Sequence, residues 1–137
     1  MSKEFLVASV KQIMATARAG EAEASFDGYR ELYADPRFLQ NRPEDQRQAL
    51  RLFVLAKRHG TPSEKAVAAY RAAIPALTEL VSTHGEPEDY EMLGLCHLTI
   101  GNAQAAGTMF REGLTLERER NAGSDLCGRL MTRLSAI

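Results

Sequence analysis

The stretch from Tyr90 to Leu116 constrains the fold more than any other part of this chain, because it combines two helical patterns around one turn at Gly101-Asn102. Apolar and small residues recur at steps of three and four on both sides of the turn, which predicts two amphipathic helices. Gly94 and Ala106 fall on the facing sides of these helices, where small side chains let two backbones approach closely. A hairpin of this size cannot bury its apolar faces alone, so further helices must pack against it.

The rest of the chain divides at glycine and proline residues into more helical patterns, and no alternating strand pattern occurs. Pro43 is a favourable first helical residue, whereas Pro75 interrupts a pattern and is expected to kink its helix without ending it. The sequence therefore predicts an all-α fold of about seven helices in antiparallel pairs. The expected helices cover residues 3–18, 22–34, 43–59, 64–81, 88–100, 103–120 and 124–136, with a loop over 36–42.

Apolar spacing also predicts which side chains face inward. In the first helix the inward set includes Phe5, Leu6 and Ile13, and the run from Leu50 to Ala56 makes the third helix apolar around most of its circumference. Gly28 lies inside the second helix, where glycine costs about 1 kcal/mol relative to alanine unless a neighbour packs closely against it.

Length and composition indicate one soluble domain over residues 1–137. The net charge of −1 gives the whole molecule no field that attracts nucleic acid or an anionic membrane. The basic row over 47–58 has only Phe53 nearby and lacks the stacking rings of single-strand binders, so no nucleic-acid partner is expected. Two cysteines fit a reducing compartment, and no apolar run reaches the ~18 residues of a membrane span, so the expected location is cytoplasmic with no membrane partner.

The stretch from Tyr90 to Leu116 resembles the tetratricopeptide repeat (TPR), whose helix pairs recur about every 34 residues with a W-x2-L-G-x2-Y and A-x3-F pattern. Tyr90 stands at the place of the tryptophan, Gly94 follows its leucine, and His97 replaces the tyrosine. In the second helix the alanine and phenylalanine match. The proline that usually closes the repeat is absent.

The resemblance extends over most of the chain with decreasing strength towards the N-terminus. It implies a short right-handed superhelical array of three repeats, at about residues 5–36, 43–83 and 87–120, closed by a capping helix at 124–136. The middle pair has one residue inserted at its turn, and in the first pair Ile13 stands where glycine is usual.

In this family the first helices of successive repeats line a concave groove that grips a peptide or helix of a partner protein. The resemblance implies a groove that is basic near the N-terminus and apolar with an acidic edge near the C-terminus, suited to an acidic-amphipathic segment. Family members that clamp a chaperone's C-terminal carboxylate use asparagines where this chain has Met14 and Val54, which argues against that activity. The residues carried over to the groove are Lys11, Met14, Arg18, Arg47, Leu50, Arg51, Val54, Lys57, Arg58, Glu88, Glu91, Met92, Leu95 and Leu98.

The function expected from this resemblance is a non-enzymatic adaptor that binds another protein. The alternative is a dedicated cytosolic chaperone for a secretion or filament substrate, and a second alternative is an enzyme of unknown type. The basic row can also be an ordinary solvated face. Met92 and Leu95 can equally be covered by the helix at 124–136 or by a second copy of the chain in a homodimer.

No catalytic residue, metal site or cofactor is expected. Cys96 and His97 are adjacent, but neighbours on a helix point about 100° apart, so they cannot act as a nucleophile and its base. The repeat pattern buries both, which indicates a packed thiol and a hydrogen-bonded core histidine. The histidines lack partners at metal-ligand spacing, and the chain contains no glycine-rich phosphate loop.

Overall fold

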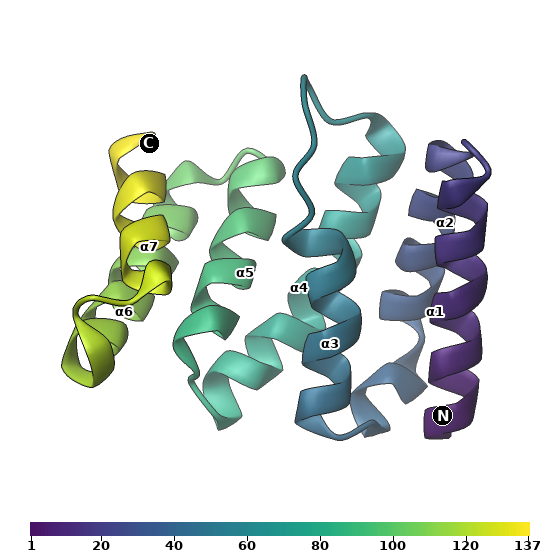
Figure 1. The fold of residues 1–137 in the computed structure, drawn as a ribbon, viewed down its shortest axis with the longest axis horizontal. Coiled ribbons are helices and arrows are strands. Elements are labelled where there is room, and N and C mark those ends of the chain that lie inside the picture. Colours follow the sequence, from purple (N-terminus) through teal and green to yellow (C-terminus); the bar gives the residue numbers. More distant parts are fainter. The chain divides into compact units, whose positions relative to one another are not determined.

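The computed structural model describes residues 1–137 and is all-helical, which confirms the all-α part of the predicted fold. Two compact units, Met1–Ala76 and Leu77–Ile137, meet within one continuous helix. The elements are α1 (Lys3–Arg18), α2 (Ala22–Ala34), the 3-10 helix η1 (Pro36–Gln40), α3 (Pro43–Val54), α4 (Glu64–Thr83), α5 (Pro87–Thr99), α6 (Ala103–Asn121) and α7 (Asp125–Ser135) (Figure 1).

Side-chain caps explain why several helices begin where they do. The hydroxyl of Ser2 accepts a hydrogen bond from the Phe5 amide at the start of α1, and Ser124 does the same for the Cys127 amide at the start of α7. Asn102 caps α6 by accepting from the Ala105 amide. Each cap satisfies an amide that has no partner within its own helix, which makes these starts readable from the sequence.

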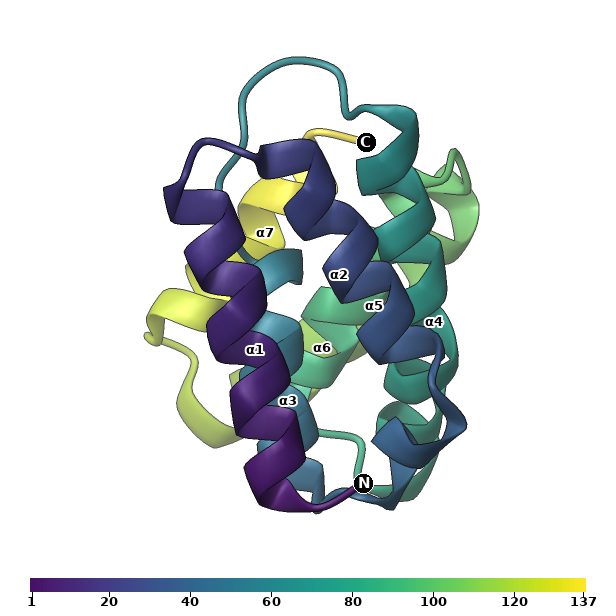
Figure 2. The same cartoon turned by 90° about the vertical axis from the view of Figure 1, so that its right-hand side faces the viewer.

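In the first unit, α1 and α2 run antiparallel, and Gly28 is what lets them approach. A Cβ added to Gly28 would lie 2.8 Å from Cγ1 of Ile13, so the isoleucine of α1 packs directly on the glycine of α2. Figure 2 shows α3 beside α1 and the first part of α4 beside α2. Helix α4 contacts α2 through the ion pair of Lys65 with Asp27, at 2.9 Å.

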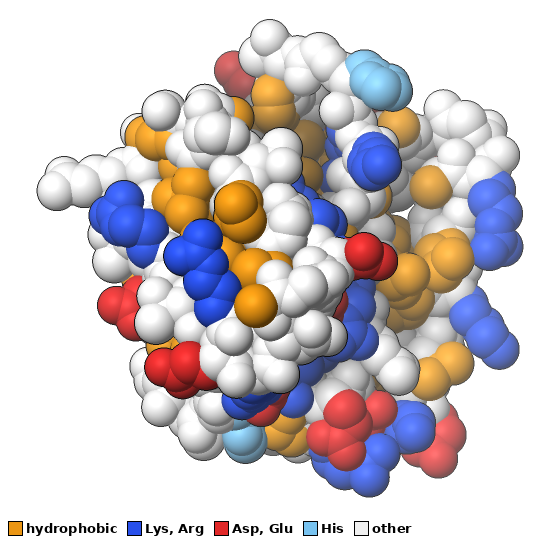
Figure 3. Space-filling model, turned by 60° about the vertical axis from the view of Figure 1, so that its left-hand side comes forward, with side chains coloured by type: hydrophobic (Ala, Val, Ile, Leu, Met, Phe, Trp, Pro, Cys, Tyr) orange, Lys and Arg blue, Asp and Glu red, His pale blue; other side chains and the backbone are white.

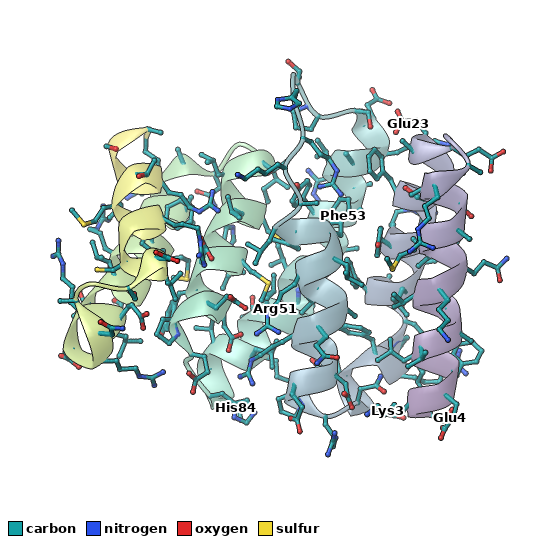
Figure 4. The ribbon with its side chains drawn as sticks, in the orientation of Figure 1. Lys3, Glu4, Glu23, Arg51, Phe53 and His84 are labelled. Atoms are coloured by element: carbon teal, nitrogen blue, oxygen red, sulfur yellow. The ribbon has the colours of Figure 1, made fainter.

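Aromatic rings form the core of this unit around Phe53, which lies near the C-terminal end of α3 (Figure 4). The Phe53 ring contacts Tyr70 at a centroid distance of 4.6 Å and Tyr29 at 5.2 Å. Phe38 of η1 is fully buried and contacts Tyr33. The segment 36–42, expected to be a loop, is thus a 3-10 helix over Pro36–Gln40 that contributes a core ring.

The third helix ends at Val54, five residues earlier than predicted. The apolar run into Ala56 suggested more helix, but the chain leaves the helix and Ala56 is exposed. The Arg58 side chain reaches back and donates a hydrogen bond to the Phe53 carbonyl, 2.7 Å away. That carbonyl lies in the last turn of α3, where it accepts only a long backbone bond of 3.4 Å from the Ala56 amide, so Arg58 helps to terminate the helix.

Two apolar side chains expected inside are exposed. Phe5 of α1 has half of its surface exposed, because Leu6 and Ile13 take the inward positions, and the Arg37 guanidinium covers one face of its ring. Leu52 of α3 is 41% exposed. Both are large apolar groups that the first unit leaves in contact with solvent.

In the second unit, α5 packs on α6 through a contact between Gly94 and the ring of Phe110. A Cβ on Gly94 would lie 2.4 Å from Cε1 of that fully buried ring, so glycine makes room for phenylalanine. The expected Gly94 partner was Ala106, which instead joins Phe110 and Leu114 in a buried cluster with α7. One turn further along the same face of α6, Gly113 lies against Tyr90 of α5.

Helix α7 is held to α5 by a buried carboxylate. Glu91 has no exposed surface, and its Oε2 accepts from Nε of Arg129 at 3.0 Å and from Nε of Arg133 at 2.9 Å. A second bond joins Nη2 of Arg129 to Oε1 of Glu91. Cys127 and Leu130 of α7 are also buried, in the apolar cluster that contains Phe110 of α6. The last helix therefore closes an apolar and charged surface of the second unit.

Candidate functional site

The first unit contains a hollow of about 400 Å³ between the C-terminal half of α1, the N-terminal half of α2 and the segment that follows α3. Its walls are mainly apolar and aromatic, and two arginines lie among them. The lining residues are Met14, Ala17, Arg18, Ala22, Ser25, Phe26, Tyr29, Leu52 and Arg58. We call this set the arginine hollow.

Arg58 is held in place by the aromatic core. Its guanidinium lies 4.3 Å from the Phe53 ring centroid and 5.2 Å from that of Phe26. It also donates to the Tyr70 hydroxyl at 3.1 Å, in addition to the Phe53 carbonyl. A planar cation stacked on two rings and bonded to two oxygens has little freedom left to lose when it binds a ligand.

The arginine hollow contains no carboxylate to neutralise Arg18 and Arg58. The partners of Arg58 are two neutral oxygens and two ring faces, none of which carries a full negative charge. Burial raises the pKa of Tyr29 on the wall, and the positive charge of Arg58 partly opposes that rise. The hollow is thus electrostatically suited to an anion attached to an apolar group.

A smaller hollow of about 150 Å³ lies between the N-terminal half of α1 and α3. Its lining is mostly aliphatic, and Lys3, labelled in Figure 4 near the start of α1, lies 3.8 Å from Asp45 across its edge. The lining residues are Lys3, Leu6, Val7, Val10, Lys11, Asp45, Gln48, Ala49 and Leu52. We call this set the aliphatic hollow. Leu52 lines both hollows and is the ridge between them.

A third hollow, of about 390 Å³, opens between α1 and α2 and is lined in part by Phe5 and Ile13. It differs in charge, because Glu31 and Asp35 line it together with uncharged polar groups. Asp35 is already bound by Arg37 at 2.7 Å, and hydrogen bonds from Arg37 lower the Asp35 pKa to about 2. This hollow therefore lacks the uncompensated charge that marks the arginine hollow.

Four residues of the predicted groove line the arginine hollow or the aliphatic hollow: Lys11, Met14, Arg18 and Arg58. Arg58 reaches its place from the segment after α3 and not from the helix that was expected to carry it. Lys57 is exposed on the same segment. Arg47 and Arg51 each have an interaction within the chain, so neither is a free cation that a ligand could bind without competition.

Several other predicted groove residues are not available to a ligand. Leu50, Val54, Glu91 and Met92 are buried, and Glu91 is bound by two arginines of α7. Leu95 packs against the cluster that α6 and α7 form, and Glu88 is half-buried with a partner of its own. The expected apolar and acidic end of the groove is therefore largely packing, because α7 covers part of it. Only Leu98 remains exposed there.

The rings and the aliphatic ridge of the arginine hollow were not among the predicted site residues. Phe26 and Tyr29 both pack on Phe53 as core residues do, yet each also lines the hollow. Leu52 was expected to face inward. One sequence signal for the site was present: Arg58 lies two residues after the apolar run at 52–56, where a cation can cap the helix end.

The second unit offers no comparable chemistry. Cys96 is fully buried, and burial raises the pKa of its thiol, which keeps it protonated. His97 is half-buried, and its Nδ1 has no hydrogen-bond partner, so the expected fully hydrogen-bonded histidine is wrong for that atom. On the face drawn in Figure 3, apolar side chains lie among lysine and arginine side chains.

No cluster of three or more histidine, cysteine, aspartate or glutamate side chains is arranged to hold a metal ion. None of the helices combines the length and apolar character that crossing a membrane requires. Comparison of the chain with models of known protein families, with curated proteins and with solved structures found no match. The site must therefore be interpreted from its own geometry.

Proposed function

We propose that the chain is a non-enzymatic helical-repeat module of the TPR type, which binds an acidic-amphipathic segment of a partner protein in its first unit. The antiparallel order of α1 to α4 and the spacing of Tyr90, Gly94 and Phe110 support the repeat assignment. The observation that carries the function is the arginine hollow, whose apolar walls hold two arginines and no carboxylate.

The proposed mechanism is recognition by a preformed surface. Arg58 is fixed by its contacts with Phe53 and Tyr70, so a ligand carboxylate meets a cation that is already oriented. Arg18, an exposed residue at the end of α1, supplies a second positive charge. Met14 and the two wall rings take the apolar part of the ligand. Because most of the ordering cost is met in folding, more of the contact energy remains for binding.

The test is charge reversal at Arg18, because Arg47 and Arg51 have intramolecular interactions whose loss would complicate the result. The variants are Arg18→Glu and, as the matched control, Arg71→Glu, an exposed arginine of α4 that lines neither hollow. A partner recovered with wild-type protein from its source cells is titrated against both variants by calorimetry. Arg18→Glu should weaken binding by about ten-fold or more, and Arg71→Glu should not change it.

Far-UV circular dichroism and thermal melting establish that both variants stay folded. Equal affinities for wild type and folded Arg18→Glu would show that the arginine hollow is not the binding site.

A further inference from the structure

The aliphatic hollow and the arginine hollow are spaced along a single helix, α1. Val7 lines the aliphatic hollow and Met14 lines the arginine hollow, and both belong to α1. Seven residues of α-helix make two turns, or about 10 Å. Leu52 of α3 stands between the hollows and is shared by them. A ligand that fills both must therefore present two apolar groups about 10 Å apart and pass over Leu52.

We infer that the ligand segment is an amphipathic helix of the partner, with two apolar anchors seven residues apart and carboxylates next to one of them; this inference rests on the proposed function. In a helix, residues i and i+7 share a face and are about 10 Å apart, which matches the hollows. In an extended segment, residues on one face are two or four apart, at about 7 or 13 Å, and neither spacing fits.

The charges of the two hollows predict which anchor of the ligand helix occupies which hollow. The arginine hollow contains two cations and no acid, so the anchor with adjacent carboxylates belongs there. The aliphatic hollow holds Asp45 beside Lys3 and Lys11, so its excess positive charge is smaller than that of the arginine hollow, and an anchor there has less need of adjacent carboxylates. Size agrees with this order, because the hollow of about 400 Å³ suits an aromatic anchor and that of about 150 Å³ suits an aliphatic one.

The experiment uses the full chain and three fluorescein-labelled synthetic peptides of about fifteen residues. The matched peptide carries phenylalanine flanked by glutamates and leucine seven residues away, on an alanine-rich helical background. The register peptide has the same composition with its anchors five residues apart, which places them on opposite sides of a helix. The helix-breaking peptide keeps the matched anchors but has proline midway between them. Binding is measured by fluorescence anisotropy.

The matched peptide should bind at least about ten-fold more tightly than either of the others, and Arg18→Glu should remove most of that affinity. Its helical signal in circular dichroism should increase when it binds. If the register or proline peptide binds equally well and still requires Arg18, the helical two-anchor inference is overturned while the proposed function stands.

If none of the peptides binds, the inference is overturned, and the titration of Arg18→Glu with the native partner decides the proposed function separately. A second copy of the chain is the competing occupant of the arginine and aliphatic hollows. Sedimentation of the chain alone addresses it: a dimer that Leu52→Glu dissociates would overturn the inference, whereas a monomer over the concentrations used supports a separate partner.

Discussion

At the scale of single residues, two glycines of the second unit predict opposite effects of the same substitution. Gly94→Ala places a Cβ 2.4 Å from the ring of Phe110, which is fully buried, so the ring or the helix must shift. We expect a loss of about 1–3 kcal/mol in the free energy of unfolding from overpacking. Gly128→Ala meets no atom within 4 Å and lies inside α7, so it should stabilise by up to about 1 kcal/mol.

Urea unfolding of the two variants and wild type, followed by circular dichroism, measures both effects. Equal stabilities of Gly94→Ala and Gly128→Ala would contradict the close approach of α5 and α6 at Phe110.

The buried thiol of Cys96 predicts a pH dependence. Burial raises its pKa above the ordinary value of 9.0, so the folded state holds the proton more tightly than the unfolded state. The contribution to stability is therefore complete below pH 9 and decreases as the pH rises above it. Between pH 8 and pH 10, the free energy of unfolding should fall more for wild type than for Cys96→Ala. Native Cys96 should also resist iodoacetamide at pH 8.5 and react fully in urea, as peptide mass mapping can establish.

The sequence showed where small side chains allow two helices to approach, but not which side chain of the other helix packs there. Gly94 was expected to allow a close approach of two helices, and Gly28 to be unfavourable unless a neighbour packs against it; Phe110 and Ile13 occupy the space that they leave. A sequence gives the size of a side chain directly, whereas its partner depends on how the helices rotate against each other. For the same reason Phe5 and Leu52 carry an apolar signal that does not say whether another helix covers them.

At the scale of helices, the ends were predictable where a local signal defines them. Ser2, Asn102 and Ser124 cap their helices through bonds three residues along the chain, which a sequence reveals. The end of α3 has a weaker local signal, the cation at position 58, and Arg58 is held there by the Phe26 ring and the Tyr70 hydroxyl from other helices of the first unit. The largest error in the candidate site, the placement of Arg58 on a helix, follows from that non-local contact.

Because Glu91 holds α7, the free energy of unfolding should depend on this one carboxylate. Glu91→Gln removes the charge that Arg129 and Arg133 share, while the amide nearly preserves the shape. Both arginines are partly exposed and can recover some hydration, so we expect a loss of about 2–3 kcal/mol rather than the full cost of an isolated buried charge. Glu112→Gln, an exposed position on α6, is the control and should change stability by less than about 0.5 kcal/mol.

Chemical unfolding compares these two variants with wild type, and hydrogen exchange of α7 amides locates the effect. Unchanged protection of α7 in Glu91→Gln would show that apolar contacts alone hold the helix.

At the scale of the whole molecule, the boundary between the two compact units falls at Ala76-Leu77, within α4 and next to Pro75. The sequence predicted that this proline would not end the helix, and α4 does continue to Thr83. The division into units was not predicted, because helical periodicity runs through the boundary without a break. It depends on which helices pack together, and that information is spread over the whole chain.

The proline in α4 predicts an effect on both units at once. Pro75 cannot donate the backbone hydrogen bond that a helix interior requires, and it is exposed, so its ring adds little burial. Pro75→Ala should therefore raise the free energy of unfolding by about 1–2 kcal/mol, less than the ~3 kcal/mol that proline costs an ideal helix, because α4 has already adapted to it. Because residues of α4 belong to both units, amide protection should increase on both sides of position 75. Thermal melting and hydrogen exchange test this, and a lower melting temperature for Pro75→Ala would contradict the expected gain in helix stability.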